Sequence, residues 1–393
     1  MTEAANHNVV NHNVEWDVAR LISFENSVVM NSEVISLHQA IGRTCAVELV
    51  AESDLPPAHT AMMDGFAVSG PGPWKISGEV RAGQYQAEIE PGTALRVSTG
   101  AHIPATCSFV IPNEEAIIFE NDVASRVPLP VGKHIRIPGD EVKTGEVVLP
   151  AGTVITPVAA GLAASSSIDE ISVYQIPSVD VLVTGDELID SGKAQPGRIR
   201  DSLSIQIPHW INQLGGQIGQ VTRVQDDQDS TRNAIASCLA PIIITTGGTA
   251  HGDFDYVRRA LDELDAQILI DEIKMRPGHP SVLAKLPSGQ LVASLPGNPL
   301  AALVSFMTIV APALNKLLGQ SLTACTFAPL RTDFEADRTR IIPVDLSTGS
   351  AEPTQFRGSA MLRGLASANA LAVIESGENS AGTQVRLLKL PWY

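Results

Sequence analysis

The segments SVDVLVTG (residues 178–185) and PIIITTGG (residues 241–248) decide the fold class of this chain. Both are short runs rich in Val and Ile that end at a glycine turn, as expected of strands covered on both faces. Helical spacing around 202–214 and 230–239 and a further strand-like run, IGQVTRV at 218–224, lie between them. Strands that alternate with helices of this length predict βαβ units and a mostly parallel sheet, with ligands at the carboxyl ends of its strands.

On either side of this α/β region, the predicted secondary structure changes several times. A polar start predicts a flexible tail over residues 1–14, and short β-rich runs cut by Gly and Pro predict an inserted β domain. A length of 393 residues also exceeds what one hydrophobic core usually organises. We therefore expect an α/β and β multidomain protein with a composite first domain (15–46 plus 146–177), an inserted β domain (47–145), an α/β domain (178–318) and a C-terminal β domain (319–393).

The composition narrows the classes of partner and compartment. With 27 basic against 43 acidic residues, the net charge is -16 at pH 7, which argues against binding to nucleic acid. The four cysteines show no CxxC spacing, so neither a zinc site nor a disulfide framework is indicated. The start lacks a basic and apolar leader, and no apolar run approaches membrane-spanning length. We expect a cytoplasmic protein in a reducing compartment, with no membrane as partner.

Acidic and glycine-rich loops follow the expected strands of the α/β domain. Glu187 comes just after the first strand, and the pair Asp226-Asp227 precedes a helix that Ser230 is expected to cap. In the loop TTGGTAHGDFDYV, the glycines Gly247 and Gly248 leave the backbone free to approach a ligand, and Asp253 and Asp255 offer oxygens for Mg²⁺ bridging to phosphate. Each element alone would also suit a turn or a helix cap. Their combination predicts a site for an anionic phosphorylated molecule with a divalent metal.

Two further loops suit an oxyanion and a helix start. The turn KMRPGHP brings up to three cationic groups together, on Lys274, Arg276 and His279. In LPGNP, Asn298 is expected to be an N-cap and Pro299 the first helical residue. Neither a Walker A loop nor the glycine fingerprint of dinucleotide-binding proteins is present, which weakens kinase and dehydrogenase interpretations.

Seven motifs in order resemble those of the MoeA family, the molybdopterin molybdenumtransferases that also include the E domain of gephyrin. They are MMDGFAV (62–68), STGAHIP (98–104), TGDEL (184–188), TTGG (245–248) followed by GDFDYV (252–257), RPGHP (276–280), LPGNP (295–299) and GSAMLRGLASAN (358–369). The resemblance implies a composite first domain, an inserted β domain, a MogA-like α/β domain and a C-terminal β barrel. It also implies insertion of molybdate into adenylylated molybdopterin, Mg²⁺ dependence, release of AMP, a homodimer, and a MogA-like adenylyltransferase as a partner.

The same motif matches imply roles for individual residues. Catalytic roles fall to Asp64, Thr99, Glu187, Asp227 and Asp255, and metal ligation to Glu187, Asp227, Asp253 and Asp255. Substrate binding falls to Gly185, Gly247, Gly248, Lys274, Arg276, His279, Pro280, Pro296, Gly297, Asn298, Arg340 and Ser359. Among these, Arg276, His279, Pro280, Arg340 and Ser359 are expected to face the molybdate. The chain departs from the family at His59 to Met62, where D-N-S-A is usual, and at the R-P-G-H turn, where K-P-G-K is usual.

Two other functions stay open at the level of sequence. The first is a paralogue that keeps the fold but acts as a pterin-binding, nucleotide-binding or scaffold protein, which the altered segment 59–61 favours. The second is a related nucleotide-processing enzyme, either an adenylyltransferase or a CinA-like pyrophosphatase. Retention of Glu187, Asp227, Asp253 and Asp255 favours an enzyme over a scaffold.

Overall fold

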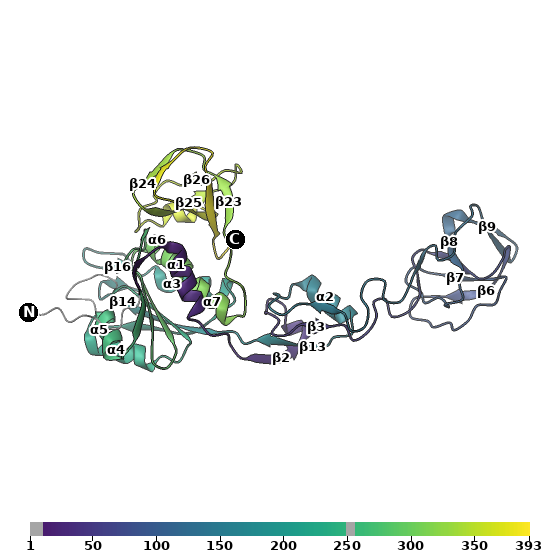
Figure 1. Ribbon diagram of the computed structural model, residues 1–393, viewed down its shortest axis with the longest axis horizontal. Helices are drawn as coiled ribbons and strands as arrows, with labels where there is room; N and C mark the ends of the chain where they lie inside the picture. Colours follow the sequence, from purple (N-terminus) through teal and green to yellow (C-terminus); the bar gives the residue numbers. More distant parts are fainter. Residues whose placement is uncertain (1–10, 249–255) are drawn as a thin grey trace, which may run out of the picture. The chain divides into compact units, whose positions relative to one another are not determined.

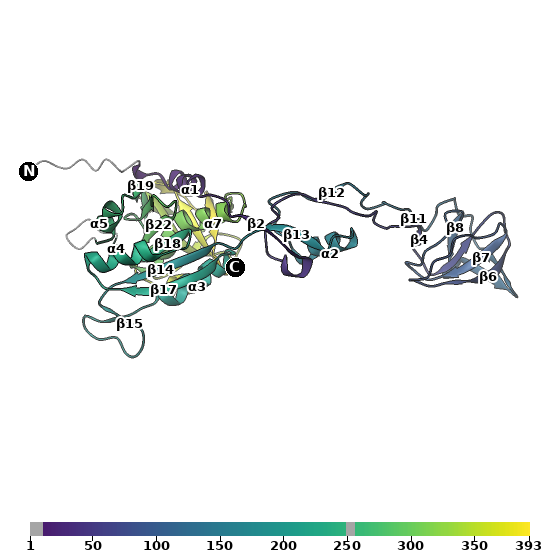
Figure 2. The same cartoon turned by 90° about the horizontal axis from the view of Figure 1, so that it is seen from below.

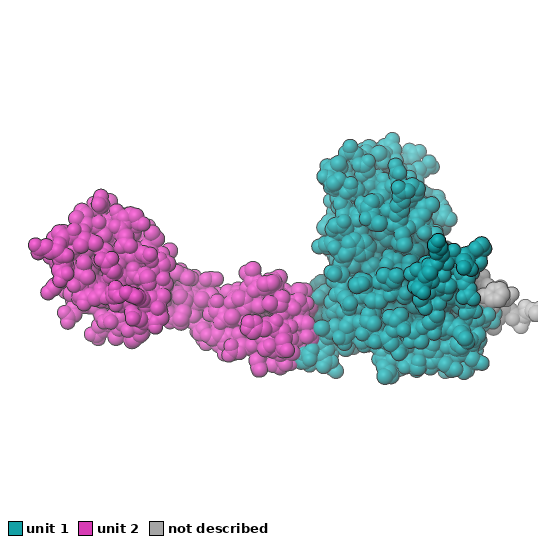
Figure 3. Space-filling model, turned by 180° about the vertical axis from the view of Figure 1, so that it is seen from behind, with its two compact units in different colours: residues 1–33, 174–393 teal, residues 34–173 magenta. Residues whose placement is uncertain are grey.

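The structure is a computed structural model that describes residues 11–248 and 256–393. It divides into two compact units, one formed by residues 1–33 and 174–393 and the other by residues 34–173 (Figure 3). Helices and several separate sheets occur together, which confirms the expected α/β and β multidomain fold class. The finer division of each unit into the expected domains stays a prediction.

The first unit contains a seven-stranded sheet whose middle is parallel. Strands β14 (Ser178–Thr184), β17 (Gln217–Val224), β18 (Ile242–Thr246) and β22 (Leu291–Leu295) run parallel to one another, whereas β21 (Val282–Lys285) runs antiparallel to both of its neighbours. Figure 2 shows β18, β14 and β17 lying next to one another. Along the sheet the order is β1 (His12–Val14), β19 (Gln267–Ile273), β21 (Val282–Lys285), β22 (Leu291–Leu295), β18 (Ile242–Thr246), β14 (Ser178–Thr184) and β17 (Gln217–Val224).

Both faces of the sheet are buried at its middle strands, whose successive side chains point to opposite sides and meet a core on each. Val181 and Val183 of β14 belong to the core that includes α3 (Leu203–Gln213) and α6 (Pro299–Ser305). Leu182, between them, packs into a separate core with α4 (Gln228–Ser237) and α5 (Tyr256–Glu263). The run VDVLV is therefore apolar at nearly every position because each face of the strand meets helices.

The segment Pro299–Leu317 is one continuous helical stretch inside the α/β core. It consists of α6, a π-helical turn at Phe306–Val310, and α7 (Ala311–Leu317). Pro312 has no N–H to donate, so a regular helical hydrogen bond is lost where the π turn occurs. The stretch is long and apolar enough to cross a membrane by composition, but 89% of it is buried within the protein. That burial is typical of a core helix.

The beginning of the chain corrects two expectations about domain organisation. Residues 12–14 are not a flexible tail, because they form β1 and pair in parallel with Asp271 to Ile273 of β19. Residues 15–33, assigned above to the composite first domain, belong to the first unit. The helix α1 (Trp16–Glu25) packs beside α7 (Figure 1), and the Trp16 indole donates to Thr308 Oγ1 at 3.0 Å. Helical spacing identified this amphipathic helix but not the core that it covers.

The C-terminal part of the first unit is a β domain joined to the α/β domain by main-chain pairing. Its sheet runs in the order β20 (Met275–Arg276), β25 (Thr339–Asp345), β27 (Ala370–Ile374), β29 (Gln384–Lys389) and β23 (Thr326–Pro329). Strand β20 comes from the RPGHP turn, and it places Arg276 opposite Arg340 of β25. A short helix, α8 (Arg363–Ala366), follows the segment 358–362.

The second unit contains a six-stranded sheet and a smaller helical part with its own core. The sheet order is β8 (Phe109–Pro112), β5 (Gly65–Val68), β7 (Thr93–Val97), β6 (Trp74–Val80), β10 (Asp122–Ser125) and β9 (Ala116–Phe119). The smaller part packs α2 (Pro157–Ser165) against residues such as Cys45, Ile155 and Val173. Thr156 begins α2 as its N-cap and accepts a hydrogen bond from the Ala159 amide.

Candidate functional site

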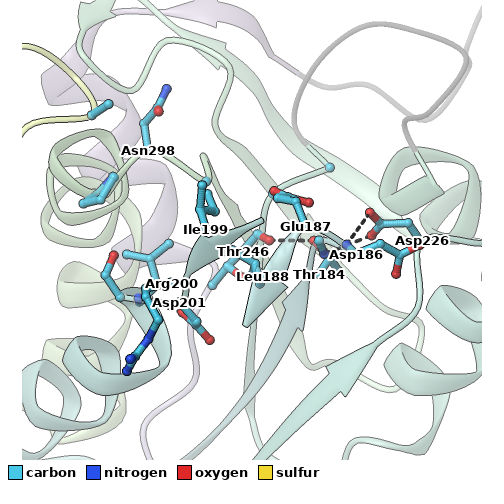
Figure 4. Close-up of a pocket in the computed structure, with 18 of the residues that line it drawn as sticks. Thr184, Asp186, Glu187, Leu188, Ile199, Arg200, Asp201, Asp226, Thr246 and Asn298 are labelled. Atoms are coloured by element: carbon cyan, nitrogen blue, oxygen red, sulfur yellow. Dashed lines mark hydrogen bonds between the residues drawn. The ribbon is translucent and has the colours of Figure 1, made fainter. Parts of the chain in front are cut away.

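A pocket of about 880 Å³ opens at the carboxyl ends of β14 and β18 (Figure 4). Ligands of mostly parallel sheets bind at this edge, so the position agrees with the sequence analysis. Six of the residues predicted above line it: Gly185, Glu187, Gly247, Gly248, Gly297 and Asn298. Residues to which the motif matches assigned no role also line it: Thr184, Asp186, Leu188, Ile199, Arg200, Asp201, Ser202, Leu203, Asp226, Thr231, Thr246, Tyr256, Val257, Pro299, Ala360 and Leu362.

The two glycines after β18 are required by the backbone at the pocket wall. Gly247 and Gly248 have φ values of +101° and +66°, a region that residues with a side chain rarely adopt. A Cβ atom on Gly248 would lie 2.5 Å from Val257 Cγ2, so the turn and α5 approach closely only because the side chain is absent. This close packing leaves main-chain atoms at the pocket surface.

Adjacent aspartates after β17 have different roles, and the prediction chose the neighbour of the one in the pocket. Asp226 lines the pocket and accepts from the amides of Gly185 and Asp186, at 3.0 and 3.1 Å. Asp227 instead is the N-cap of α4 and accepts from the Ser230 amide at 2.8 Å. The expectation that Ser230 would cap this helix is therefore wrong. The hydrogen bond from the Ser230 amide also lowers the pKa of Asp227, as a bond to the charged form should.

At the base of the acidic loop, the end of β14 is hydrogen-bonded to the end of β18. Figure 4 shows Glu187, Asp186 and Asp226 at the end of β14, near Thr184 and Thr246. The Thr184 hydroxyl donates to the Thr246 carbonyl at 2.6 Å. The Thr246 hydroxyl is buried and has no hydrogen-bond partner among the described residues. A ligand in the pocket would offer that hydroxyl a partner.

Another acid at the pocket is Asp201, which precedes α3. Its Oδ1 accepts from the amides of Leu203 and Ser204, at 2.9 and 3.1 Å, and its Oδ2 lies 3.6 Å from Arg223 Nη2. Arg223 also donates to the Leu188 carbonyl at 2.7 Å, so it ties the loop between β14 and α3 to β17. Asp201 is 6% exposed. An Asp-Ser pair directly before an expected helix was the sequence signal that could have identified it.

The cationic turn 274–280 lies outside this pocket, and its charges have separate partners. Lys274 Nζ is 2.6 Å from Glu15 Oε1. His279 Nδ1 lies 2.8 Å from the Ile273 carbonyl oxygen, and Nε2 lies 3.5 Å from Glu272. Both side chains therefore make contacts with other parts of the first unit rather than with one another. Pro280 follows this turn and is half-buried.

The remaining cation of the turn, Arg276, lies beside a group of arginines from the C-terminal domain. Its main-chain partner is Arg340, and its nearest acidic group is Asp337, at 3.9 Å. Burial, followed by the nearby positive charge of Arg276, lowers the pKa of Arg340, and Arg357 adds to this effect. The Nε of Arg340 is buried and has no acceptor among the described residues. Excess positive charge therefore gathers here in an otherwise acidic protein.

The helix α6 is capped by main chain from the C-terminal domain rather than by its own first residues. The carbonyl of Ser359 accepts from the amides of Leu300 and Ala301, at 2.9 and 3.3 Å. Asn298 occupies the N-cap position without a side-chain bond, and Pro299 begins the helix as expected. Pro296 is buried, whereas Gly297 and Asn298 face the pocket. Ser359 is thus adjacent to the pocket but contributes to it through helix capping.

Asp64 and Thr99 lie in the second unit and contact each other directly. Asp64 Oδ1 accepts from both the amide and the hydroxyl of Thr99, at 2.6 and 2.8 Å. These bonds lower the pKa of Asp64 and favour its charged form. Both residues are exposed.

Asp253 and Asp255 lie outside the described residues. Among the residues that are described, no group of three or more His, Cys, Asp or Glu side chains is arranged to hold a metal ion.

Comparison with known proteins covers nearly the whole chain. Residues 13–167 match a family model described as "MoeA N-terminal region (domain I and II)", residues 180–316 match "Probable molybdopterin binding domain", and residues 328–390 match "MoeA C-terminal region (domain IV)". Molybdopterin molybdenumtransferase from Staphylococcus aureus strain Mu50 is 30% identical over 93% of this chain and 91% of that protein. The protein of the same name from Staphylococcus epidermidis strain ATCC 12228 is 30% identical over 87% of each.

A solved structure shows the same arrangement of elements. The molybdopterin biosynthesis MoeA protein of Pyrococcus horikoshii OT3 matches with a TM-score of 0.80 and 24% identity, over 95% of this chain and 99% of that one. At this level of identity the likeness is one of fold. Because the sequence matches extend over the full set of family regions, the chain belongs to the MoeA family, whose curated members are molybdopterin molybdenumtransferases.

Proposed function

We propose that this protein is a molybdenum insertase of molybdenum cofactor biosynthesis, which transfers molybdate into adenylylated molybdopterin and releases AMP. The observation that carries the proposal is the pocket of about 880 Å³ at the strand ends, where Glu187, Asp226, Gly247 and Gly248 meet. Its volume falls within the range of roughly 300 to 1,000 Å³ that cofactor-sized ligands occupy. The name carried by the Staphylococcus relatives supports the same function.

The walls of the pocket suit both the flat rings and the phosphates of adenylylated molybdopterin. Leu188, Ile199 and Leu362 offer apolar contacts to flat rings, and Tyr256 begins α5 at the same pocket. The amides at the start of a helix favour anions, so the phosphates of the substrate belong near Gly247, Gly248 and α5. Asp226 would hold the Gly185 turn in the conformation that presents Glu187 to these phosphates.

Mg²⁺ is part of the proposal, and the described residues fit it in one particular way. A ring of three protein ligands is absent among them, but Mg²⁺ commonly binds through one or two carboxylates together with water and substrate phosphates. Glu187 and Asp226 provide that number of carboxylates at the pocket, and Asp253 and Asp255 stay proposed ligands. When bound, the ion would neutralise phosphate charge and polarise the linkage to AMP.

Molybdate is proposed to bind at the arginines where β20 meets β25. Arg276 and Arg340 are opposite each other in the sheet, and the Arg340 Nε has no acceptor among the described residues. A tetrahedral oxyanion would supply acceptors and offset the concentrated positive charge. The contacts of Lys274 and His279 give these two side chains a smaller part in that site than the motif match implied.

Further parts of the proposal concern assembly and location. We propose a homodimer, supply of the adenylylated pterin by a MogA-like adenylyltransferase, and a cytoplasmic location. All four cysteines are free thiols, which is consistent with a reducing compartment. Neither nucleic acid nor a membrane is proposed as a partner.

The test is complementation of a cell that lacks its molybdenum insertase, scored by nitrate reductase activity. The purified chain is assayed in parallel for AMP release from adenylylated molybdopterin with molybdate and Mg²⁺. Rescue with molybdate-dependent AMP release supports the proposal. Binding of the pterin without turnover would identify a scaffold instead. ATP-dependent adenylylation, or cleavage of ADP-ribose, would identify one of the nucleotide-processing alternatives.

A further inference from the structure

A second cavity, of about 230 Å³, lies between helices of the α/β domain and the end of the C-terminal domain, within the first unit. Met307 and Ala311 from the helical stretch 299–317 line one side, and Leu388 and Leu390 at the end of β29 line another. It shares no lining residue with the pocket at the strand ends. The cavity therefore needs an explanation of its own.

Arg20 of α1 lines this cavity and is a buried charge, with only 6% of the residue exposed. Its Nη2 donates to the Thr323 carbonyl, and its Nη1 has only the sulfur of Cys325, at 3.7 Å. Its Nε is buried and has no acceptor among the described residues. The guanidinium also stacks over the Trp16 ring, 4.8 Å from its centroid. A group with five N–H donors is thus only partly satisfied.

Among the described residues, Arg20 has no ion-pair partner. None of the described side chains that line the cavity is acidic, although the chain has 43 Asp and Glu residues, and the terminal carboxylate of Tyr393, which also lines the cavity, makes no ion pair with Arg20. Arg386 offers a direct comparison, because its guanidinium also lies over the Trp16 ring, 4.9 Å from the centroid, but pairs with Asp17 and Glu375. Buried charges in proteins are normally paired, because the desolvation of a lone ion costs several kcal/mol. An unpaired buried arginine at a cavity indicates that an anion from outside completes the site.

We propose that this cavity binds a small monocarboxylate with an apolar body. The planar guanidinium matches a carboxylate, whereas Met307, Ala311 and Leu388 provide apolar contacts for the rest of the ligand. The volume is below the range of roughly 300 to 1,000 Å³ that is usual for larger ligands, so a molecule of about the size of phenylacetate fits better than a nucleotide. This inference does not depend on the function proposed for the first pocket.

The test uses calorimetry on the full chain with phenylacetate and its neutral analogue phenylacetamide. Phenylacetate should bind saturably, and phenylacetamide at least about tenfold more weakly, because it lacks the charge that Arg20 would pair with. Arg20→Gln should weaken phenylacetate binding by at least about tenfold and leave the weaker binding of the amide unchanged. Arg386→Gln is the matched control: it removes the other arginine over Trp16 and should leave phenylacetate affinity unchanged.

A second variant keeps the test valid if Arg20→Gln folds poorly. Ala311→Leu adds volume on the cavity wall and leaves Arg20 in place, so it should abolish phenylacetate binding in folded protein, although overpacking at this buried position lowers the thermal midpoint. The proposal is overturned if phenylacetate and phenylacetamide bind equally, or if phenylacetate affinity survives in folded Arg20→Gln or Ala311→Leu protein. Hexanoate serves as a second monocarboxylate with an apolar body. The proposal is also overturned if neither phenylacetate nor hexanoate gives saturable heat of binding in the millimolar range.

Discussion

The adjacent acids Asp226 and Asp227 allow a sharp test of the site. Asp226→Asn and Asp227→Asn each remove one negative charge, but only Asp226 lines the pocket. Asp226 accepts two amide hydrogen bonds at the pocket, whereas Asp227 caps α4. Asp226→Asn keeps one acceptor oxygen and loses the other. One hydrogen bond to a charged group contributes about 1.5 to 3 kcal/mol, so activity should fall roughly ten- to a hundredfold.

The control, Asp227→Asn, should behave differently because Asn caps helices about as well as Asp. We expect near-normal activity and a nearly unchanged thermal midpoint. The assay is the initial rate of AMP release from adenylylated molybdopterin, with circular dichroism to confirm that both variants are folded. If Asp227→Asn loses activity while Asp226→Asn keeps it, the placement of Asp226 as the functional acid is refuted.

Three further substitutions test stability, backbone geometry and oxyanion binding. Burial alone would raise the pKa of Asp271, but hydrogen bonds and charge from Arg258 and His12 lower it overall. Asp271→Asn should therefore cost about 1.5 to 3 kcal/mol at pH 7. This difference should shrink as pH falls from the unfolded-state pKa of about 3.9 through the lower pKa of the folded state; unfolding curves at several pH values measure it. Gly248→Ala should cost about 1 to 3 kcal/mol for its backbone conformation and also reduce AMP release, because its Cβ would clash beside the pocket. Arg340→Gln should raise the molybdate concentration needed for half-maximal rate by about tenfold or more.

Each of these substitutions has its own control or contrary outcome. A pH-independent difference for Asp271→Asn would show that the ion pair is not its cause. Gly289→Ala has a similar backbone cost at φ +93°, but a Cβ there meets no atom within 4 Å, so activity should be retained. Arg338→Gln removes an arginine that pairs with Asp337 and should leave the molybdate requirement nearly unchanged. An equal response of Arg338→Gln and Arg340→Gln would argue against a specific oxyanion site.

Much of the pocket could be predicted because its position follows from strand ends. The apolar runs of β14 and β18 each stop at a glycine, and residues that follow parallel strands must meet at one edge of the sheet. This reasoning correctly placed Gly185, Glu187, Gly247 and Gly248 together. It could not separate Asp226 from Asp227. Asp227 lies in extended backbone, where adjacent side chains point in opposite directions, and only the packing of the loop decides which one faces the pocket.

The sequence by itself determined the parts of the protein that depend on local periodicity and turn chemistry: the βαβ order, the buried strands, the start of α6 at Pro299, and the family to which the motifs belong. Tertiary structure alone decided which core α1 joins, that residues 12–14 extend the sheet, and that Arg276 meets Arg340. It also left Arg20 buried without an ion-pair partner in the part of the chain that the structure describes. The physical reason is that hydrophobic spacing records which face of an element is buried but not its partner, because apolar contacts carry no direction.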